Sequence, residues 1–459
     1  MDAARAAELI GAIPLAAATC CLLREIMDEE RLNDLFDTHR GRGYEKILTF
    51  PAMVRMIGDA LLQEGGSAHR VFSRAKEDGD LEASMVAAYG KLGRLNISLS
   101  MAFLTNGTDP LRAIFPKQAR RQPPPCLRDF QTVILDGKAI KDVAKRLLPL
   151  RHAGGGLLGG RTLVALEYST GLALGMHAVA DGEANDSRFV PDLLPVVQDR
   201  LKGPLLWMAD RGFCDLNRLE DFTKNGNHFL VRYHKKNGFH RDPGRKVIEG
   251  KDAKGRCVLQ EWGWLGAETH KKRRYVRRIT LFRPGEEDVI LMTNLIQSKD
   301  YPATELLAHY LERWGIERMF QQVTETFGLQ RLIGGTPEAT IFQFSFCLLL
   351  YNVMQTIRAF VAMHQKRDCE TISMENLFRD TREELTTFMV LRRRGVIRLE
   401  HLPPTQRDLH ALLKDLLKDQ WSDRWIKACN KNPRRPAPHS KKRSHSSVYR
   451  LLHPETQRC

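Results

Sequence analysis

The stretch TELLAHYLERWGIERMFQQVTETFG, residues 304–328, decides how the rest of the sequence is interpreted. Its spacing predicts one amphipathic helix, because at about 100° per residue Tyr310, Arg313 and Glu317 fall on one narrow stripe. An apolar stripe beside it consists of Ile316, Phe320, Val323 and Phe327. Taken alone, this is the pattern of an ordinary helix with a solvated charged face. The sequence upstream gives Glu317 a chemical setting.

Composition favours a polyanionic partner. The 459 residues include 71 Lys and Arg against 55 Asp and Glu, a formal net charge of +16. Such an excess favours nucleic acid as the partner, although it can also serve solubility alone. The nine Cys include no C-x-x-C pair, which argues against a disulfide framework and against a structural zinc site. We expect a cytoplasmic, nucleoid-associated protein.

No membrane partner is expected. The most apolar run, residues 341–363, is interrupted by five polar residues, which are Gln343, Ser345, Asn352, Gln355 and Arg358. It therefore predicts a buried helix and no membrane span. The first residues lack a basic leader before their apolar run, so a secretory signal is not predicted.

The order of the predicted elements indicates a helical domain followed by an α/β core. Residues 1–125 carry helical patterns, close on the Pro-rich RRQPPPC and are a candidate for binding DNA ends. In residues 126–235, three β-rich runs precede alternating helix and strand, which predicts a mixed sheet flanked by helices. The later segments are a β-rich basic insertion (236–300), helices that complete the core (301–365), a helical C-terminal segment (366–425) and a basic tail (426–459).

Two aspartates stand at the ends of predicted strands. Asp136 follows the apolar QTVIL, within LDGK, and Asp210 follows PLLWMA, within ADRGF. With Glu317 they suit a two-metal carboxylate site, in which ions about 3.5–4 Å apart activate the attacking oxygen and stabilise the leaving one. Hard oxygen ligands suit two Mg²⁺ ions, for which Mn²⁺ could substitute. Spacing alone is weak support, because three acids among 55 fit many schemes.

The insertion is strongly basic. Between residues 227 and 283 there are 16 Lys and Arg against 5 Asp and Glu. The segment KKRRYVRR interleaves an aromatic with cations, which favours contact with a nucleic-acid backbone over the alternative of a charge-protected sheet edge. The predicted DNA contacts here are Lys271, Lys272, Arg273, Arg274, Arg277 and Arg278. The tail is a second basic candidate, because it has no acid between residues 426 and 450.

Tyr310 and Arg313 carry donors suited to phosphate oxygens. Because they share the stripe of Glu317, both are predicted to contact the DNA near the cut. The alternative is structural, with Arg313 paired to Glu317 or to Asp136.

Three local motifs together resemble a known family. LDGK at Asp136, D-x-G-F at Asp210 and Y-x-x-R-x-x-x-E ending at Glu317 are similar to those of DDE transposases of bacterial insertion sequences, in the subgroup with the YREK signature. The resemblance implies an RNase H-like core with a β insertion, and Asp136, Asp210 and Glu317 as catalytic metal ligands. It also implies metal-dependent DNA cleavage and strand transfer. The implied partners are double-stranded DNA, comprising terminal inverted repeats and target DNA, and a second copy of the chain in a homodimer on paired ends.

Two positions depart from the family pattern. The signature lysine, seven residues after the glutamate, is Thr324 here, and Arg318 or Arg331 are candidates to replace it. Relatives that cut through a DNA hairpin place a Trp just before the strand that corresponds to ILMTN, and that position is Val289 here. The remaining candidates for that role are Trp262 and Trp264, each with a core position as the alternative.

Two other functions use the same sequence features. One is a DNA-binding protein of transposase descent that has lost its chemistry, which the intact three acids argue against. The other is an RNase H-like nuclease without strand transfer, which shares the metal chemistry and which sequence separates poorly from a transposase.

Overall fold

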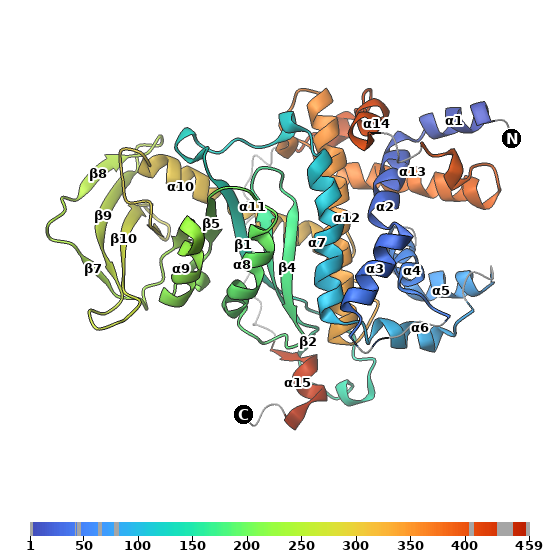
Figure 1. Cartoon of the computed structure of the whole chain (residues 1–459), viewed down its shortest axis with the longest axis horizontal. Coiled ribbons are helices and arrows are strands. Elements are labelled where there is room, and N and C mark those ends of the chain that lie inside the picture. Colours follow the sequence, from blue (N-terminus) through green and yellow to red (C-terminus); the bar gives the residue numbers. More distant parts are fainter. Residues whose placement is uncertain are drawn as a thin grey trace.

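The computed structural model describes residues 3–41, 43, 47–62, 67–77, 82–403, 408–428 and 444–455. Residues 429–443 and 456–459 of the predicted basic tail lie outside the described residues. The β-rich insertion lies at one end of the long axis, the centre of the sheet lies in the middle, and N-terminal and C-terminal helices lie together at the other end (Figure 1).

The centre of the sheet consists of apolar runs that each form one buried strand. β1 (Gln131–Ala139) pairs antiparallel with β3 (Arg161–Glu167), which pairs antiparallel with β4 (Ala173–Val179). β5 (Leu205–Ala209) pairs parallel with β1, and β6 (His228–Arg232) pairs parallel with β5. The predicted three-strand meander and the alternation that follows it are confirmed.

Helices cover both faces of this sheet. On one face, α8 (Val190–Gln198) and α9 (Leu216–Thr223) bury an apolar cluster that includes Trp207 of β5. Helix α9 supplies the crossover that a parallel β5–β6 pair requires. On the other face, the second and larger apolar cluster joins the sheet to the remaining helices. The predicted RNase H-like mixed sheet flanked by helices is confirmed.

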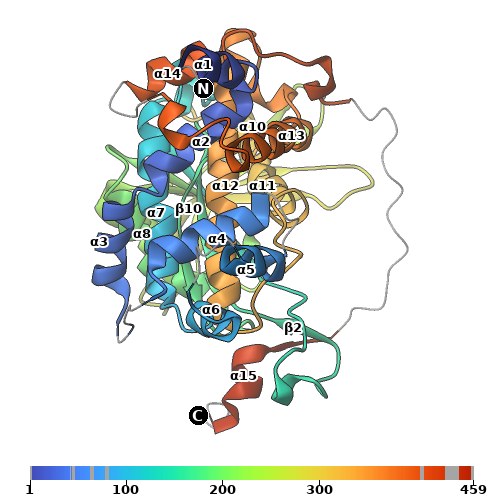
Figure 2. The same cartoon turned by 90° about the vertical axis from the view of Figure 1, so that its right-hand side faces the viewer.

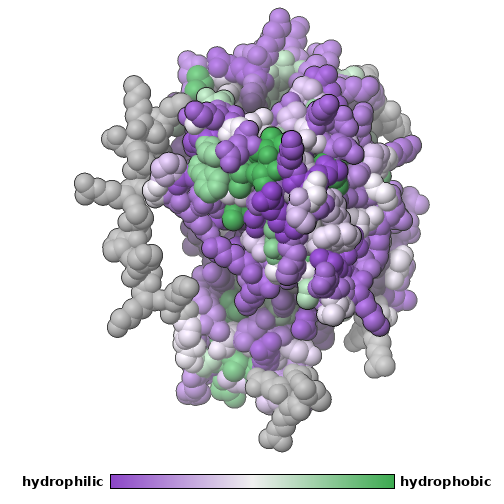
Figure 3. Space-filling view, turned by 90° about the vertical axis from the view of Figure 1, so that its left-hand side faces the viewer, coloured by the Kyte–Doolittle hydropathy of each residue, from purple (hydrophilic) through white to green (hydrophobic). Residues whose placement is uncertain are grey.

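The insertion extends the same sheet. Its strands are β7 (Phe239–Arg241), β8 (Ile248–Lys251), β9 (Cys257–Leu265), β10 (Arg274–Leu281) and β11 (Val289–Thr293). β11 pairs antiparallel with β6, so that ten strands run in the order β4-β3-β1-β5-β6-β11-β10-β9-β7, with β8 on β9. The surface at this end is mostly hydrophilic, with a confined apolar patch (Figure 3).

The stretch 304–328 forms two helices, so the prediction of one long helix is wrong. α10 spans Ala303–Leu311 and α11 spans Trp314–Glu325. At the junction the amides of Glu312 and Arg313 bond to carbonyls three residues back, at His309 and Tyr310. Such bonds tighten the last turn of α10 and end its regular ladder. Gly315 lies in the first turn of α11, where it weakens continuous helix by about 1 kcal/mol relative to Ala.

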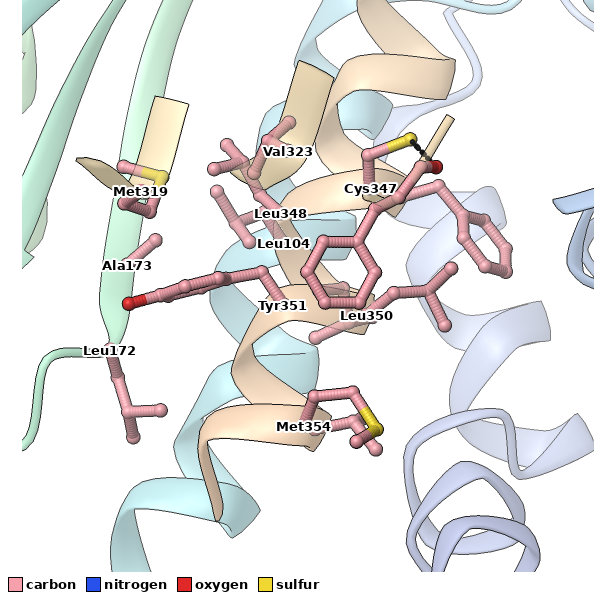
Figure 4. Close-up of a cluster of buried hydrophobic side chains, with 14 of the residues drawn as sticks. Leu104, Leu172, Ala173, Met319, Val323, Cys347, Leu348, Leu350, Tyr351 and Met354 are labelled. Atoms are coloured by element: carbon pink, nitrogen blue, oxygen red, sulfur yellow. Dashed lines mark hydrogen bonds between the residues drawn. The ribbon is translucent and has the colours of Figure 1, made fainter. Parts of the chain in front are cut away.

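Helix α12 (Pro337–His364) forms the centre of the helical end. It is long and apolar enough to cross a membrane, but 94% of its most apolar window is buried inside the structure, as predicted for a core helix. It packs against α7 (Ile97–Ile114) and α11, with Leu104, Met319 and Val323 facing α12 side chains (Figure 4). α11 is thereby fixed to the core along its apolar stripe.

The other helices surround α12 and α7 (Figure 2). N-terminal to α7 lie α1 (Ala3–Gly11), α2 (Pro14–Ile26), α3 (Glu29–His39), α4 (Phe50–Leu62), α5 (Ala68–Glu77) and α6 (Met85–Leu92). C-terminal to α12 lie α13 (Met374–Arg393), α14 (Leu409–Leu416) and α15 (Val448–Leu452). A separate pair of short parallel strands joins β2 (Gly156–Leu158) to β12 (His445–Ser447) near the C-terminus.

Candidate active site

The first two predicted acids lie on adjacent parallel strands. Leu135 of β1 is in register with Ala209 of β5, and the next residue on each strand is Asp136 and Asp210. Neighbouring strands lie about 4.8 Å apart, so both aspartates meet at the carboxyl edge of the sheet. The backbone amide of Gly137 donates a 2.8 Å hydrogen bond to Asp136 Oδ1, which orients that carboxylate.

Arg313 connects the aspartates to the predicted glutamate. Its Nη2 lies 2.7 Å from Glu317 Oε1 and its Nη1 lies 3.7 Å from Asp136 Oδ2. Although burial disfavours its charged form, neighbouring Tyr310 and Asp210, with Glu317 and Asp136, raise the pKa of Arg313. The Arg313 side chain is only 5% exposed, so its guanidinium lies inside the group of three carboxylates. Strands β1 and β5 and the first turn of α11 thus bring the three acids together.

Negative charge at this site is only partly compensated. Burial raises the pKa of Asp136 to about 6; the charges of Glu317 and Asp210 act in the same direction, while Arg313 and the Gly137 amide oppose the shift. Asp210 Oδ1 is buried and accepts no hydrogen bond from the described residues. Buried polar atoms normally have partners, so this oxygen marks a place where a further cation or donor belongs.

The donor set suits a hard divalent cation. Among the described residues, no three His, Cys, Asp or Glu side chains are already grouped to hold a metal ion, because the Arg313 guanidinium lies between the carboxylates. The unpartnered Asp210 oxygen and the raised pKa of Asp136 both indicate a need for positive charge. Carboxylate oxygens are the ligands that Mg²⁺ and Mn²⁺ accept. The residues therefore fit such an ion chemically.

Tyr310 and Arg313 do not face outward as a DNA contact would. Tyr310 is buried, and its hydroxyl donates a 3.3 Å hydrogen bond to the Ala209 carbonyl at the end of β5. Burial raises the pKa of its phenol. The observed pairing of Arg313 with Glu317 and Asp136 corresponds to the structural alternative, because the junction between α10 and α11 turns the guanidinium toward the sheet.

Two neighbours of Asp136 escaped the sequence argument. Lys138, on the same face of β1, holds its ammonium 5.5 Å from the Phe320 ring of α11. Its position two residues after Asp136 in LDGK was the available signal. On the opposite face, a Cβ at Gly137 would lie 1.6 Å from Asp186 Oδ2, so the strand needs glycine there. Asp186 itself is held 2.5 Å from Arg161 Nη2 and carried no sequence signal.

The basic segment of β10 contributes less exposed charge than its composition indicates. Arg277 is fully buried, and its Nη1 donates 2.7 Å to the Tyr301 carbonyl. This burial removes Arg277 from the DNA contacts predicted from sequence, because backbone carbonyls after β11 satisfy its guanidinium. Arg278 pairs with Glu261 at 2.5 Å and lies 4.2 Å from the Phe239 ring.

The other four predicted contacts lie nearer the surface. Lys271 is exposed, and Lys272 lies 2.6 Å from Glu220 of α9. Arg273 lies 4.8 Å from the ring of Trp264, and Arg274 donates 2.8 Å to a hydroxyl on α9. Surface ion pairs of this kind are weak, so these side chains can exchange partners for phosphate.

Comparison with protein-family models matches residues 131–353 to the transposase DDE domain. The chain contains a transposase DDE domain. This domain spans β1 to the middle of α12 and includes Asp136, Asp210 and Glu317, together with the whole insertion. The match supports a transposase function, which in this family generally uses divalent metal ions.

Comparison with solved structures includes a piggyBac transposase synaptic complex with hairpin DNA, determined by cryo-electron microscopy. Its TM-score is 0.37 and its sequence identity 11%, over 92% of this chain and 91% of that chain. No curated protein matched the chain.

The two departures from the family pattern have clear positions in the DDE domain. Thr324 donates 2.7 Å to the Phe320 carbonyl of its own helix, so it offers no cation to a ligand. Val289 is buried at the start of β11. Trp262 is buried with its Nε1 bonded 2.9 Å to the Ile296 carbonyl, whereas Trp264 is 39% exposed.

Proposed function

We propose that this chain is a DNA transposase that cleaves the ends of an insertion sequence and joins them to target DNA. The observation that carries the proposal is the convergence of Asp136, Asp210 and Glu317 around one buried guanidinium within a transposase DDE domain. Adjacent strand ends and a helix fixed to the core hold the three acids in place, as a site for phosphoryl transfer requires.

We propose that these three carboxylates would hold two Mg²⁺ ions, or Mn²⁺ in their place. When bound, the ions would activate the attacking oxygen and stabilise the leaving one. Arg313 orients Glu317 through their 2.7 Å contact. Tyr310 ties the junction of α10 and α11 to the end of β5 through the Ala209 carbonyl, which fixes the helix against the strand that carries Asp210.

The other parts of the chain are proposed to bind DNA. The insertion (236–300) and the basic tail (426–459) would supply non-specific electrostatic affinity, and the helical domain (1–125) would help bind the element ends. Phosphate neutralisation releases counterions, so this affinity should fall steeply with salt. We further propose a homodimer that pairs two terminal inverted repeats and works at the bacterial nucleoid in the cytoplasm.

Cleavage of DNA by single alanine variants of Asp136, Asp210 and Glu317 tests the proposal. Each variant should lose cleavage with Mg²⁺ or Mn²⁺ while duplex binding persists, because a ligand and a negative charge are both removed. The matched control is Glu325→Ala, an exposed acid near the end of the same helix. Wild-type cleavage by any one of the three variants removes that residue from the site.

A joining assay separates the remaining functions. A donor duplex that ends in a 3′-OH is incubated with supercoiled target DNA, and a transposase should produce joined products. Cleavage without joining identifies a nuclease. Duplex binding with neither activity identifies a DNA-binding protein that has lost its chemistry, for which the loss of a cation at Thr324 is the motivating observation.

A further inference from the structure

A second group of charges lies beside α11, around the carboxylate of Glu370. Arg121 Nη2 contacts Glu370 Oε1, and Arg358 Nη2 lies 2.8 Å from the same oxygen. Lys427 Nζ lies 3.3 Å from Glu370 Oε2, and Arg318 Nη2 lies 3.8 Å from it. Four cations thus surround one acid, and although burial opposes ionisation, they hold the pKa of Glu370 far below its usual range.

This Glu370 cluster gathers segments that lie far apart in the sequence. Arg121 belongs to the connection between α7 and β1, Arg318 to α11, Arg358 to α12 and Lys427 to the chain after α14. Glu370 begins just after α12, in a short helical turn at Cys369–Thr371. Crossing connections of this kind make the position of each cation independent of local chain flexibility.

The positive charge of the Glu370 cluster exceeds its negative charge. Within 4 Å, the described residues pair these four cations only with Glu370, and Glu312 adds a more distant negative charge near Arg121. Arg358 is buried, but the Arg318 side chain is 50% exposed and that of Lys427 is 38% exposed. The uncompensated charge therefore reaches the surface.

The Glu370 cluster borders the three catalytic acids. A Cβ at Gly315 would lie 3.8 Å from Arg121 Nη1 and 3.9 Å from Arg318 Nη2, so both guanidinium groups flank the first turn of α11. Glu317 lies on the same turn, one residue before Arg318. Because Gly315 has no side chain, nothing from α11 covers the space between the two groups.

We propose that the Glu370 cluster binds a backbone phosphate of the DNA strand that enters the active site. A phosphate oxygen placed against Arg121, Arg318 and Lys427 would neutralise the excess charge, and guanidinium groups suit phosphate oxygens through paired donors. The proposal rests on the proposed function, because it needs DNA at the site. The rival is structural, in which the ion pairs only tie α11 and α12 to the segments at residues 121 and 427.

Affinity for a short duplex of arbitrary sequence, measured against NaCl concentration, tests this proposal. The double variant Arg318→Gln, Lys427→Gln removes the two most exposed cations of the cluster. Each lost phosphate contact lowers the slope of log affinity against log salt by about 0.9, so the slope should fall by about 1 to 2. The double variant Arg318→Lys, Lys427→Arg keeps both charges and should keep the slope. Lys418→Gln, an exposed lysine just after α14, is the control for loss of a remote charge.

Thermal unfolding of the same variants decides between the two roles. A reduced slope with an unchanged unfolding midpoint supports phosphate binding. An unchanged slope with a lowered midpoint supports the structural rival and overturns the proposal, as does an equal loss of slope in Lys418→Gln. If the wild-type protein itself shows no salt-dependent duplex binding, the proposed function fails, which is a separate outcome from wild-type binding that the variants leave intact.

Discussion

Replacing Asp136 by Asn should stabilise the protein while abolishing DNA cleavage. The carboxylate is partly buried beside two other acids, and burial raises its pKa from 3.8 to about 6. Its ionised form at neutral pH therefore destabilises the folded state. Asn keeps the shape and the acceptor for the Gly137 amide, but it removes the charge that the site must hold.

The magnitude follows from the pKa shift. A shift of about 2 units corresponds to about 3 kcal/mol, at 1.36 kcal/mol per unit. Because the Asp136 side chain is 23% exposed and solvent screens part of its charge, we expect a gain of about 1 to 2 kcal/mol. The sign depends on pH. The folded pKa lies above the unfolded value, so the stability that the proton provides is present below pH 3.8 and is lost as pH rises through about 6. Variant and wild type should therefore converge in acid and separate above pH 6.

Urea unfolding on both sides of pH 6 measures this difference, with Asp192→Asn, an exposed aspartate on α8, as the control. Mg²⁺ should raise the unfolding midpoint of the wild type more than that of Asp136→Asn, because an ion that binds the folded state stabilises it. A variant less stable than the wild type at neutral pH would refute the reasoning. It would mean that the contact with Arg313 contributes more than burial of the carboxylate costs.

Two further predictions concern residues that hold the site together. Arg313→Ala should lower stability by about 2 kcal/mol, measured by urea unfolding, because it leaves neighbouring acids without their shared cation; an unchanged midpoint with weakened duplex binding would instead make Arg313 a DNA contact. Gly137→Ala should lower stability by about 1 to 3 kcal/mol and reduce cleavage, because its Cβ would overlap Asp186; adding Asp186→Ala should restore the unfolding midpoint, and failure to do so would place the strain elsewhere.

The strands and the acids at their ends could be predicted because the information is local. Each apolar run such as QTVIL or PLLWMA is one strand long and ends at a polar residue, so Asp136 and Asp210 had to emerge at the edge of a sheet. That β1 and β5 are neighbours is a matter of pairing, which the two runs do not encode. The family motifs supplied the expectation that these two ends meet.

The junction at Arg313 could not be predicted from its own stretch. Periodicity continues through residues 304–328, but the guanidinium turns toward Asp136, which lies on a strand more than a hundred residues earlier. The burial of Arg277 has the same origin. Within KKRRYVRR it looks like its charged neighbours, and only carbonyl groups at Leu295 and Tyr301, brought close by the return of the chain, satisfy its donors. Tertiary contacts therefore decide which charges of a basic run reach solvent.

The unbroken ladder from β6 through β11 to β10 and β9 has a mechanical consequence. Hydrogen bonds across a sheet resist shear, so the insertion cannot swing on a hinge relative to the strands that carry the catalytic aspartates. A duplex held by the insertion would therefore meet the cutting centre at one set angle, as a workpiece meets a blade in a jig. The distance between grip and cut would then be a property of the sheet, and it would change by whole strand spacings rather than continuously.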